Sequence, residues 1–106
     1  MASAPPSSKS QVQRGRPKGT KTFDAPTANA FGAVIRRRRL AHGIAQEQLA
    51  LLSNTDRSFV GKVERGENQP SLVLILRLAK ALDCSGADLI ADVETTLGRL
   101  SKRTNN

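Results

Sequence analysis

Apolar residues recur at helical spacing from Phe31 onward, whereas residues 1–29 show neither helical nor strand periodicity. The first predicted helix covers residues 30–42, with Phe31 and Ile35 on one face and Gly43 after its end. Four further helices are expected where apolar periodicity resumes between polar breaks, over residues 46–53, 57–65, 72–83 and about 86–99. The pattern therefore predicts an all-α fold of five helices.

Polar residues that favour helix ends stand at these breaks. Asp56 and Ser71 precede the third and fourth helices, where their side chains can cap the first turn. Asn54 tolerates the left-handed conformation and suits the tight turn before the third helix. Ser85 and Asp88 have the spacing of a reciprocal capping pair for the fifth helix. In the fourth helix the leucines are so dense that nearly all are expected to be buried.

Composition divides the chain into a flexible arm and one folded domain. The 106 residues, of which 38% are hydrophobic, suffice for one small helical core. Residues 1–29 are rich in Ser, Pro, Gly, Lys and Thr, and such a segment cannot offset the entropy lost on ordering. We therefore assign residues 1–29 to a disordered basic arm and residues 30–106 to the domain.

The charge balance points to a polyanionic partner. Seventeen Lys and Arg against nine Asp and Glu give a formal net charge of +8, which suits nucleic acid or, alternatively, an acidic membrane surface. No apolar run approaches the roughly 18 residues of a membrane-spanning helix, and no hydrophobic signal core opens the chain. We expect a cytoplasmic, nucleoid-associated protein. Single-stranded RNA is disfavoured because stacking aromatic side chains are scarce.

Residue patterns typical of catalysis or metal binding are missing from the sequence. The single cysteine, Cys84, and the single histidine, His42, are distant in the chain. They form neither a zinc site nor a convincing nucleophile–base pair. We therefore expect a protein without enzymatic activity, metal or cofactor.

The most specific signal is the stretch QEQLALLSNTDRSFVGKVERGE, residues 46–67. Gln46 opens a helix, small Ala50 stands where two helices can cross closely, and Asn54 falls at the turn between them. Followed by PSL and LAKAL, the stretch resembles the Cro and lambda-repressor type of helix-turn-helix family, often called the XRE family, over residues 30–92. The resemblance implies a lambda-repressor-like five-helix domain and a dimeric transcriptional regulator that binds double-stranded DNA.

The same resemblance assigns DNA contacts to individual residues. Base edges in the major groove would be read by Arg57, Ser58 and Lys62, which can point outward together from the third helix. An ordinary solvated helix face is the alternative. Phosphate contacts are implied for Gln46, Arg65 and Asn68.

The run of four arginines at residues 36–39 cannot share one role, because helical geometry spreads it around about one full turn. By family position Arg39 is expected to pair with Glu64 in a structural salt bridge. The other three arginines are expected to be solvated.

The arm contains RGRPKG at residues 14–19, which resembles the AT-hook. In that motif an extended backbone follows the floor of an A·T-rich minor groove, and arginines splay along it. The residues that would form this minor-groove arm are Arg14, Gly15, Arg16, Pro17 and Lys18. A plain basic linker is the alternative.

An apolar stripe continues along the fifth helix past the usual end of the family's domain. Its spacing favours a homodimer formed through Val93, Leu97 and Leu100, with packing back on the first helix as the alternative. Val73 and Leu74 of the fourth helix are either extra core or part of a partner surface.

Two other functions remain open at the level of the sequence. One is an antitoxin-type protein that neutralises a protein partner, which the sequence does not identify, and binds DNA secondarily. The other is an architectural protein that binds DNA without sequence preference. Genomic neighbours or a co-purifying protein would distinguish the first, and competition by random DNA the second.

Overall fold

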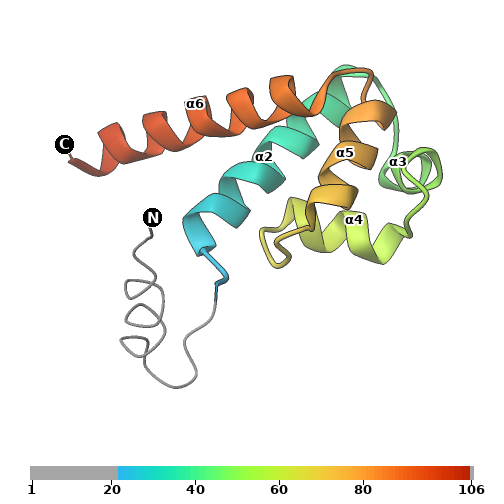
Figure 1. Ribbon diagram of the computed structural model, residues 1–106, viewed down its shortest axis with the longest axis horizontal. Helices are drawn as coiled ribbons and strands as arrows, with labels where there is room; N and C mark the ends of the chain where they lie inside the picture. Colours follow the sequence, from blue (N-terminus) through green and yellow to red (C-terminus); the bar gives the residue numbers. More distant parts are fainter. Residues whose placement is uncertain (1–21, 106) are drawn as a thin grey trace, which may run out of the picture.

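The computed structural model describes residues 22–105, with side chains up to residue 100. In this range the chain forms five helices and no strand: α2 (Ala25–Ala41), α3 (Gln46–Leu52), α4 (Arg57–Glu64), α5 (Leu72–Ala81) and α6 (Gly86–Asn105). The helices surround one hydrophobic core, and α2 packs against both α4 and α6 (Figure 1). The AT-hook-like residues 14–18 lie outside the described residues.

Helix α2 begins at Ala25, earlier than the apolar pattern predicts. Asp24 caps it by accepting hydrogen bonds from the Thr27 amide at 3.1 Å and the Thr27 hydroxyl at 2.6 Å. These hydrogen bonds lower the pKa of the Asp24 carboxyl below its usual value. Residues 25–29 contain no large apolar side chain, so periodicity could not reveal this turn. The predicted arm boundary at residue 29 is therefore wrong, because residues 25–29 are helical.

The other helix ends use the residues that the sequence indicates. Asp56 and Ser71 accept amide hydrogen bonds at 2.8 and 3.3 Å in the first turns of α4 and α5. Ser85 and Asp88 cap α6 reciprocally. Asn54 adopts the predicted left-handed conformation, with φ of 58°, in the turn between α3 and α4.

A close crossing joins α2 to α4. Gly32 of α2 lies against the backbone of Val63 and Glu64, and a Cβ at Gly32 would overlap the Val63 carbonyl oxygen. Around the crossing, Ile35 and Val60 are fully buried. The missing side chain at Gly32 therefore sets how closely α4 approaches the long central helix.

Helix α6 folds back along α2 (Figure 1). Leu89 and Val93 of its apolar stripe are buried, whereas Ile90 and Leu100 stay 41% and 40% exposed. Asp92 of α6 accepts from Arg37 at 2.7 Å and from Arg38 at 3.1 Å, so these two arginines are not simply solvated as predicted. Val93 is only 5% exposed and belongs to the core. The predicted dimer contact through Val93 is therefore wrong, because the side chain is already covered within one chain.

Helix α5 departs from the sequence expectation in the opposite direction. Leu78 and Ala79 are buried, but Leu72, Val73 and Leu76 are 70%, 57% and 50% exposed. The expectation that nearly all leucines of this helix are buried is therefore wrong. Only one side of the helix packs against the core, and the density of leucines does not show which side. An apolar face of α5 is thus left open to solvent.

None of the helices within residues 22–105 combines the length and the apolar character that crossing a membrane requires.

Candidate nucleic-acid interface

Helices α3 and α4 form a closely packed pair joined by a short turn. Ala50, the small residue predicted at their crossing, is 3% exposed. Its carbonyl accepts the Thr55 amide at 2.8 Å, which secures the turn. Val60 and Val63 are fully buried beneath α4. The opposite face of α4 is consequently held outward on a rigid support.

The outward face of α4 carries the three residues predicted to read bases. Arg57, Ser58 and Lys62 are all exposed. Phe59, on the neighbouring flank, is partly buried and packs against the core, so it serves as support. Groups that donate hydrogen bonds thus project from one short helix whose other side is fixed.

Behind this face, a hydrogen-bonded network joins three helices. Arg39 of α2 donates to Glu64 of α4 through Nε at 2.6 Å and Nη2 at 3.0 Å, which is the predicted salt bridge. Its Nη1 donates to the Ile44 carbonyl at 2.9 Å. Gln46 of α3 donates to the same Glu64 carboxylate through Nε2 at 2.9 Å. The hydrogen bonds that Arg39 donates to Glu64 raise the pKa of its guanidinium.

An open polar hollow of about 250 Å³ lies where α3 meets the outward face of α4. Gln46, Arg57, Ser58, Gly61 and Arg65 line it. Two guanidinium groups in an open polar hollow attract an anion, and their planar donor geometry matches phosphate. The structure thus brings together two predicted phosphate contacts and two predicted base contacts. Lys62 and Asn68 do not line the hollow.

An ion pair orients Arg65 at the edge of the hollow. Arg65 donates to Glu67 through Nε at 2.7 Å and through Nη2 at 3.3 Å. This hydrogen bonding raises the pKa of Arg65 and lowers the pKa of Glu67, and the nearby charge of Lys62 lowers the latter further. Both side chains are more than half exposed.

Comparison with known proteins places this geometry in a family. A model of the helix-turn-helix family matches residues 35–89, about half of the chain. The chain belongs to this family. The sequence interpretation of an XRE-type regulator fold is confirmed, as is the all-α, lambda-repressor-like class.

This helix-turn-helix protein is similar to a control protein and to a restriction-modification controller. The control protein C.SmaI of Serratia marcescens is 39% identical over 56 residues, which cover 53% of this chain and 67% of that protein. The crystal structure of the restriction-modification controller C.AhdI of Aeromonas hydrophila has 52% identity and a TM-score of 0.57, covering 58% of this chain and 94% of that one.

A further solved structure is similar to this helix-turn-helix protein and contains nucleic acid. It is the tetramer of the restriction-modification controller C.Esp1396I in complex with its natural 35-base-pair operator. The identity is 25% and the TM-score 0.63, and the match covers 67% of this chain and 93% of that chain.

Sequence reasoning on this helix-turn-helix protein missed Gly61, Glu67 and Gln69. Gly61 lines the hollow, and Glu67 holds Arg65. Gln69 accepts from the Asp24 amide at 2.8 Å, which ties the loop after α4 to the start of α2. Gly61 carried a usable signal, because a glycine inside a helix is unfavourable and needs a structural reason.

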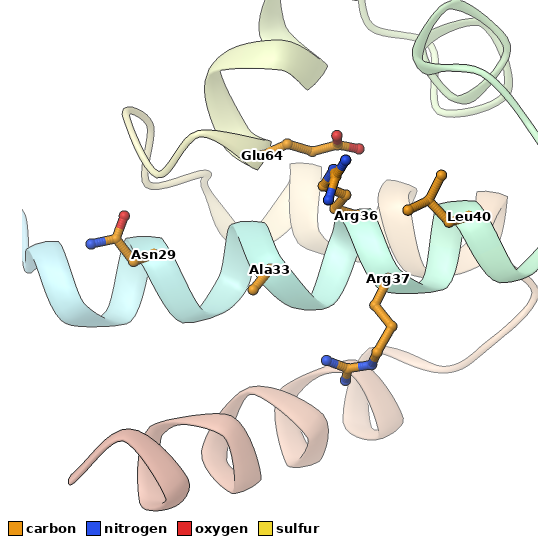
Figure 2. Close-up of a pocket in the computed structure, with 6 residues that line it drawn as sticks. All are labelled: Asn29, Ala33, Arg36, Arg37, Leu40 and Glu64. Atoms are coloured by element: carbon orange, nitrogen blue, oxygen red, sulfur yellow. The ribbon is translucent and has the colours of Figure 1, made fainter. Parts of the chain in front are cut away.

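A second hollow lies beside α2 and is a weaker anion site (Figure 2). It is lined by Asn29, Ala33, Arg36, Arg37, Leu40 and Glu64, and Arg37 reaches from α2 toward α6. Arg37 is paired with Asp92, and the lining includes the carboxylate of Glu64, whereas no carboxylate of the described residues lines the hollow at α3 and α4. The hollow at α3 and α4 is therefore the better candidate for binding a polyanion.

Over the described part of the chain, no cluster of three or more His, Cys, Asp or Glu has the arrangement of a metal site.

Proposed function

We propose that this protein is a sequence-specific, double-stranded DNA-binding transcriptional regulator that acts as a dimer in the cytoplasm. The observation that carries the proposal is the exposed, donor-rich face of α4 beside a hollow lined by Arg57 and Arg65. An α-helix with such a face fits the major groove, which is about 12 Å wide. The similarity to the operator-bound controller C.Esp1396I supports the same conclusion.

Each residue of this face has a proposed role. Arg57 pairs with guanine through two parallel hydrogen bonds, Ser58 bonds either base, and Lys62 bonds a guanine acceptor or a phosphate. Phosphate contacts fall to Gln46, Arg65 and Asn68. Because Gln46 is tied to Glu64, its contact would transmit the position of the DNA backbone to the helix that reads bases.

We infer that a second copy covers the exposed face of α5 and the adjoining turn of α6. Leu72 and Leu76 lie one helical turn apart on α5, and Leu76 packs beside Gly86 at the start of α6. Ile90, one turn further along α6, is 41% exposed and borders an apolar hollow of about 90 Å³. Val93 lines that hollow from the core side, so it packs beneath this surface. Leu97 packs partly against the core, whereas Leu100 is 40% exposed.

The arm is proposed to enter the minor groove beside the major-groove site. Arg14, Gly15, Arg16, Pro17 and Lys18 keep the AT-hook sequence on a basic tether. Such an arm would favour A·T pairs flanking or interrupting the operator.

Selection of bound duplexes from a random pool tests the proposed function. The affinity of the Arg57→Ala variant is then measured for the selected site and for random DNA. The variant should lose about 1–3 kcal/mol of binding free energy for the selected site and less for random DNA. Arg99→Ala removes the same charge from the exposed far end of α6 and serves as the control. Equal losses on both DNAs would remove Arg57 from base reading, and a pool without enrichment would overturn sequence specificity.

A further inference from the structure

Gly61 lies on the outward face of α4 and is nevertheless buried. It stands one helical turn after Arg57 and one turn before Arg65, so the three share one side of the helix. The nearest atoms to a Cβ built at Gly61 would be Arg65 Nη1 at 3.1 Å and, further off, Gln46 Oε1 at 3.9 Å. The glycine is therefore covered by the Arg65 guanidinium, which lies back along the helix.

The hydrogen bonds of Arg65 engage only one edge of its guanidinium. Nε and Nη2 face Glu67, while Nη1 lies beside Gly61, and both Arg65 and Gly61 line the hollow. Within residues 22–105, no hydrogen bond of Nη1 accompanies those two. A guanidinium has five N–H donors in a fixed fork, so the edge carrying Nη1 is available to a ligand oxygen.

We propose that Gly61 is a positioning residue for DNA binding: by lacking a side chain, it lets Arg65 lie across α4 and present Nη1 to a backbone phosphate in the hollow. This inference rests on the proposed function and names a residue that acts in it without touching DNA. Glu67 also positions Arg65, because its carboxylate accepts hydrogen bonds from Nε and Nη2 of the guanidinium. A cation fixed before binding loses less entropy when the phosphate arrives.

Gly61→Ala separates this role from a structural one. The added Cβ would be 3.1 Å from Nη1, closer than an ordinary contact, so the guanidinium must shift by a few tenths of an ångström from its place over Gly61. The atom that moves is the end of a flexible side chain, and alanine is a better helix former than glycine. The melting temperature should therefore stay the same or rise while DNA binding weakens.

The matched control is Gly98→Ala on α6, where an added Cβ meets no atom within 4 Å. It makes the same helical substitution on an exposed surface away from the hollow. We expect it to preserve or raise the melting temperature and to leave DNA binding unchanged.

The experiment measures binding of a random-sequence duplex of about three helical turns, roughly 30 base pairs, over a range of salt concentrations. Gly61→Ala should weaken binding about tenfold for each protomer bound, the size of one hydrogen bond to a charged group. It should also reduce the salt slope by about 0.9 for each protomer, or about 1.8 for a dimer that loses two phosphate contacts. Unchanged affinity and slope would overturn the proposal, because Arg65 would then reach the phosphate by another route.

A double-mutant cycle with Arg65→Ala completes the test. If Gly61 acts through Arg65, adding Gly61→Ala to Arg65→Ala should cause no further loss of affinity. A further loss would overturn the proposal and show that the α4 backbone itself must approach the DNA closely. A wild-type chain that binds no duplex would instead refute the proposed function, and this inference with it.

Discussion

Glu64 is the residue at which α2, α3 and α4 meet. Its carboxylate accepts two hydrogen bonds from Arg39 and one from Gln46, and its side chain is only 3% exposed. Burying a charge at this depth is tolerable only because the guanidinium and the amide satisfy it. The residue thereby fixes the orientation of α4 relative to both neighbouring helices.

Replacing Glu64 by Gln should destabilise the domain by about 3–5 kcal/mol, because Arg39 is left as a buried charge without a counter-ion. Denaturant unfolding measures the change. Glu47→Gln, an isosteric substitution at an exposed position of α3, is the control and should change stability by less than about 0.5 kcal/mol. Equal stability of the two variants would mean that the Arg39–Glu64 pair contributes nothing in solution.

At the scale of the element, the short helix α4 depends on its neighbours for both support and direction. Eight residues are too few for a stable isolated helix, so packing must supply the stability. Two glycines serve this packing in different ways. Gly32 allows α2 to approach the end of α4, and Gly61 leaves room for Arg65 on the other side.

Gly32→Ala should destabilise the domain by about 1–3 kcal/mol, since the added Cβ would overlap backbone atoms that cannot move independently. Thermal unfolding measures the change, and Gly98→Ala provides the same substitution in open space. Because alanine is favoured in helices, the control should be neutral or stabilising. Comparable destabilisation in both variants would contradict a role for the α2–α4 crossing.

On the scale of the whole molecule, the donor-rich face and the apolar face lie on different elements. The donor-rich face belongs to α3 and α4, and the apolar face to α5 and the first turns of α6. A two-fold dimer formed through the apolar face would present two copies of α4 to half-sites about 34 Å apart, so a pseudo-palindromic operator is expected.

Leu76→Glu should shift the protein from dimer to monomer, because it places a charge at the centre of the apolar face. Sedimentation at tens of micromolar, roughly the range of weak dimers, measures the mass. Leu40→Glu is the matched control, since Leu40 is 53% exposed against 50% for Leu76 and lies on α2 beside the other hollow. A wild-type chain that sediments as a monomer with and without DNA would refute the dimer.

Deleting residues 1–20 should weaken DNA binding and abolish any preference for A·T pairs outside the core site. The deletion stops before Thr22, whose carbonyl accepts a hydrogen bond from Gln69. Replacing Gly15 by Val keeps every charge, so it should remove the A·T preference while preserving most of the salt dependence. Full A·T preference in the Gly15→Val variant would reduce the arm to a basic tail.

The sequence by itself determined the elements whose signals are local. The caps at Asp56, Ser71 and Ser85 and the turn at Asn54 follow from one or a few neighbouring residues, and all are present in the structure. Local chemistry decides them because a cap or a turn is satisfied within about four residues of chain. The Arg39–Glu64 pair was predictable only through family resemblance.

Only the tertiary structure decided which apolar and charged residues remain available. Val93 and Leu76 both lie on amphipathic helices, yet Val93 is buried against the core and nothing in the described chain fully covers Leu76. Tertiary contacts likewise decide the surroundings of two arginines. Arg37 pairs with Asp92, 55 residues away in the chain, and the Arg65 guanidinium lies beside Gly61. Which residues stay exposed depends on where distant elements meet. Periodicity along the chain identifies the apolar face of a helix, but it does not identify the element that packs against that face.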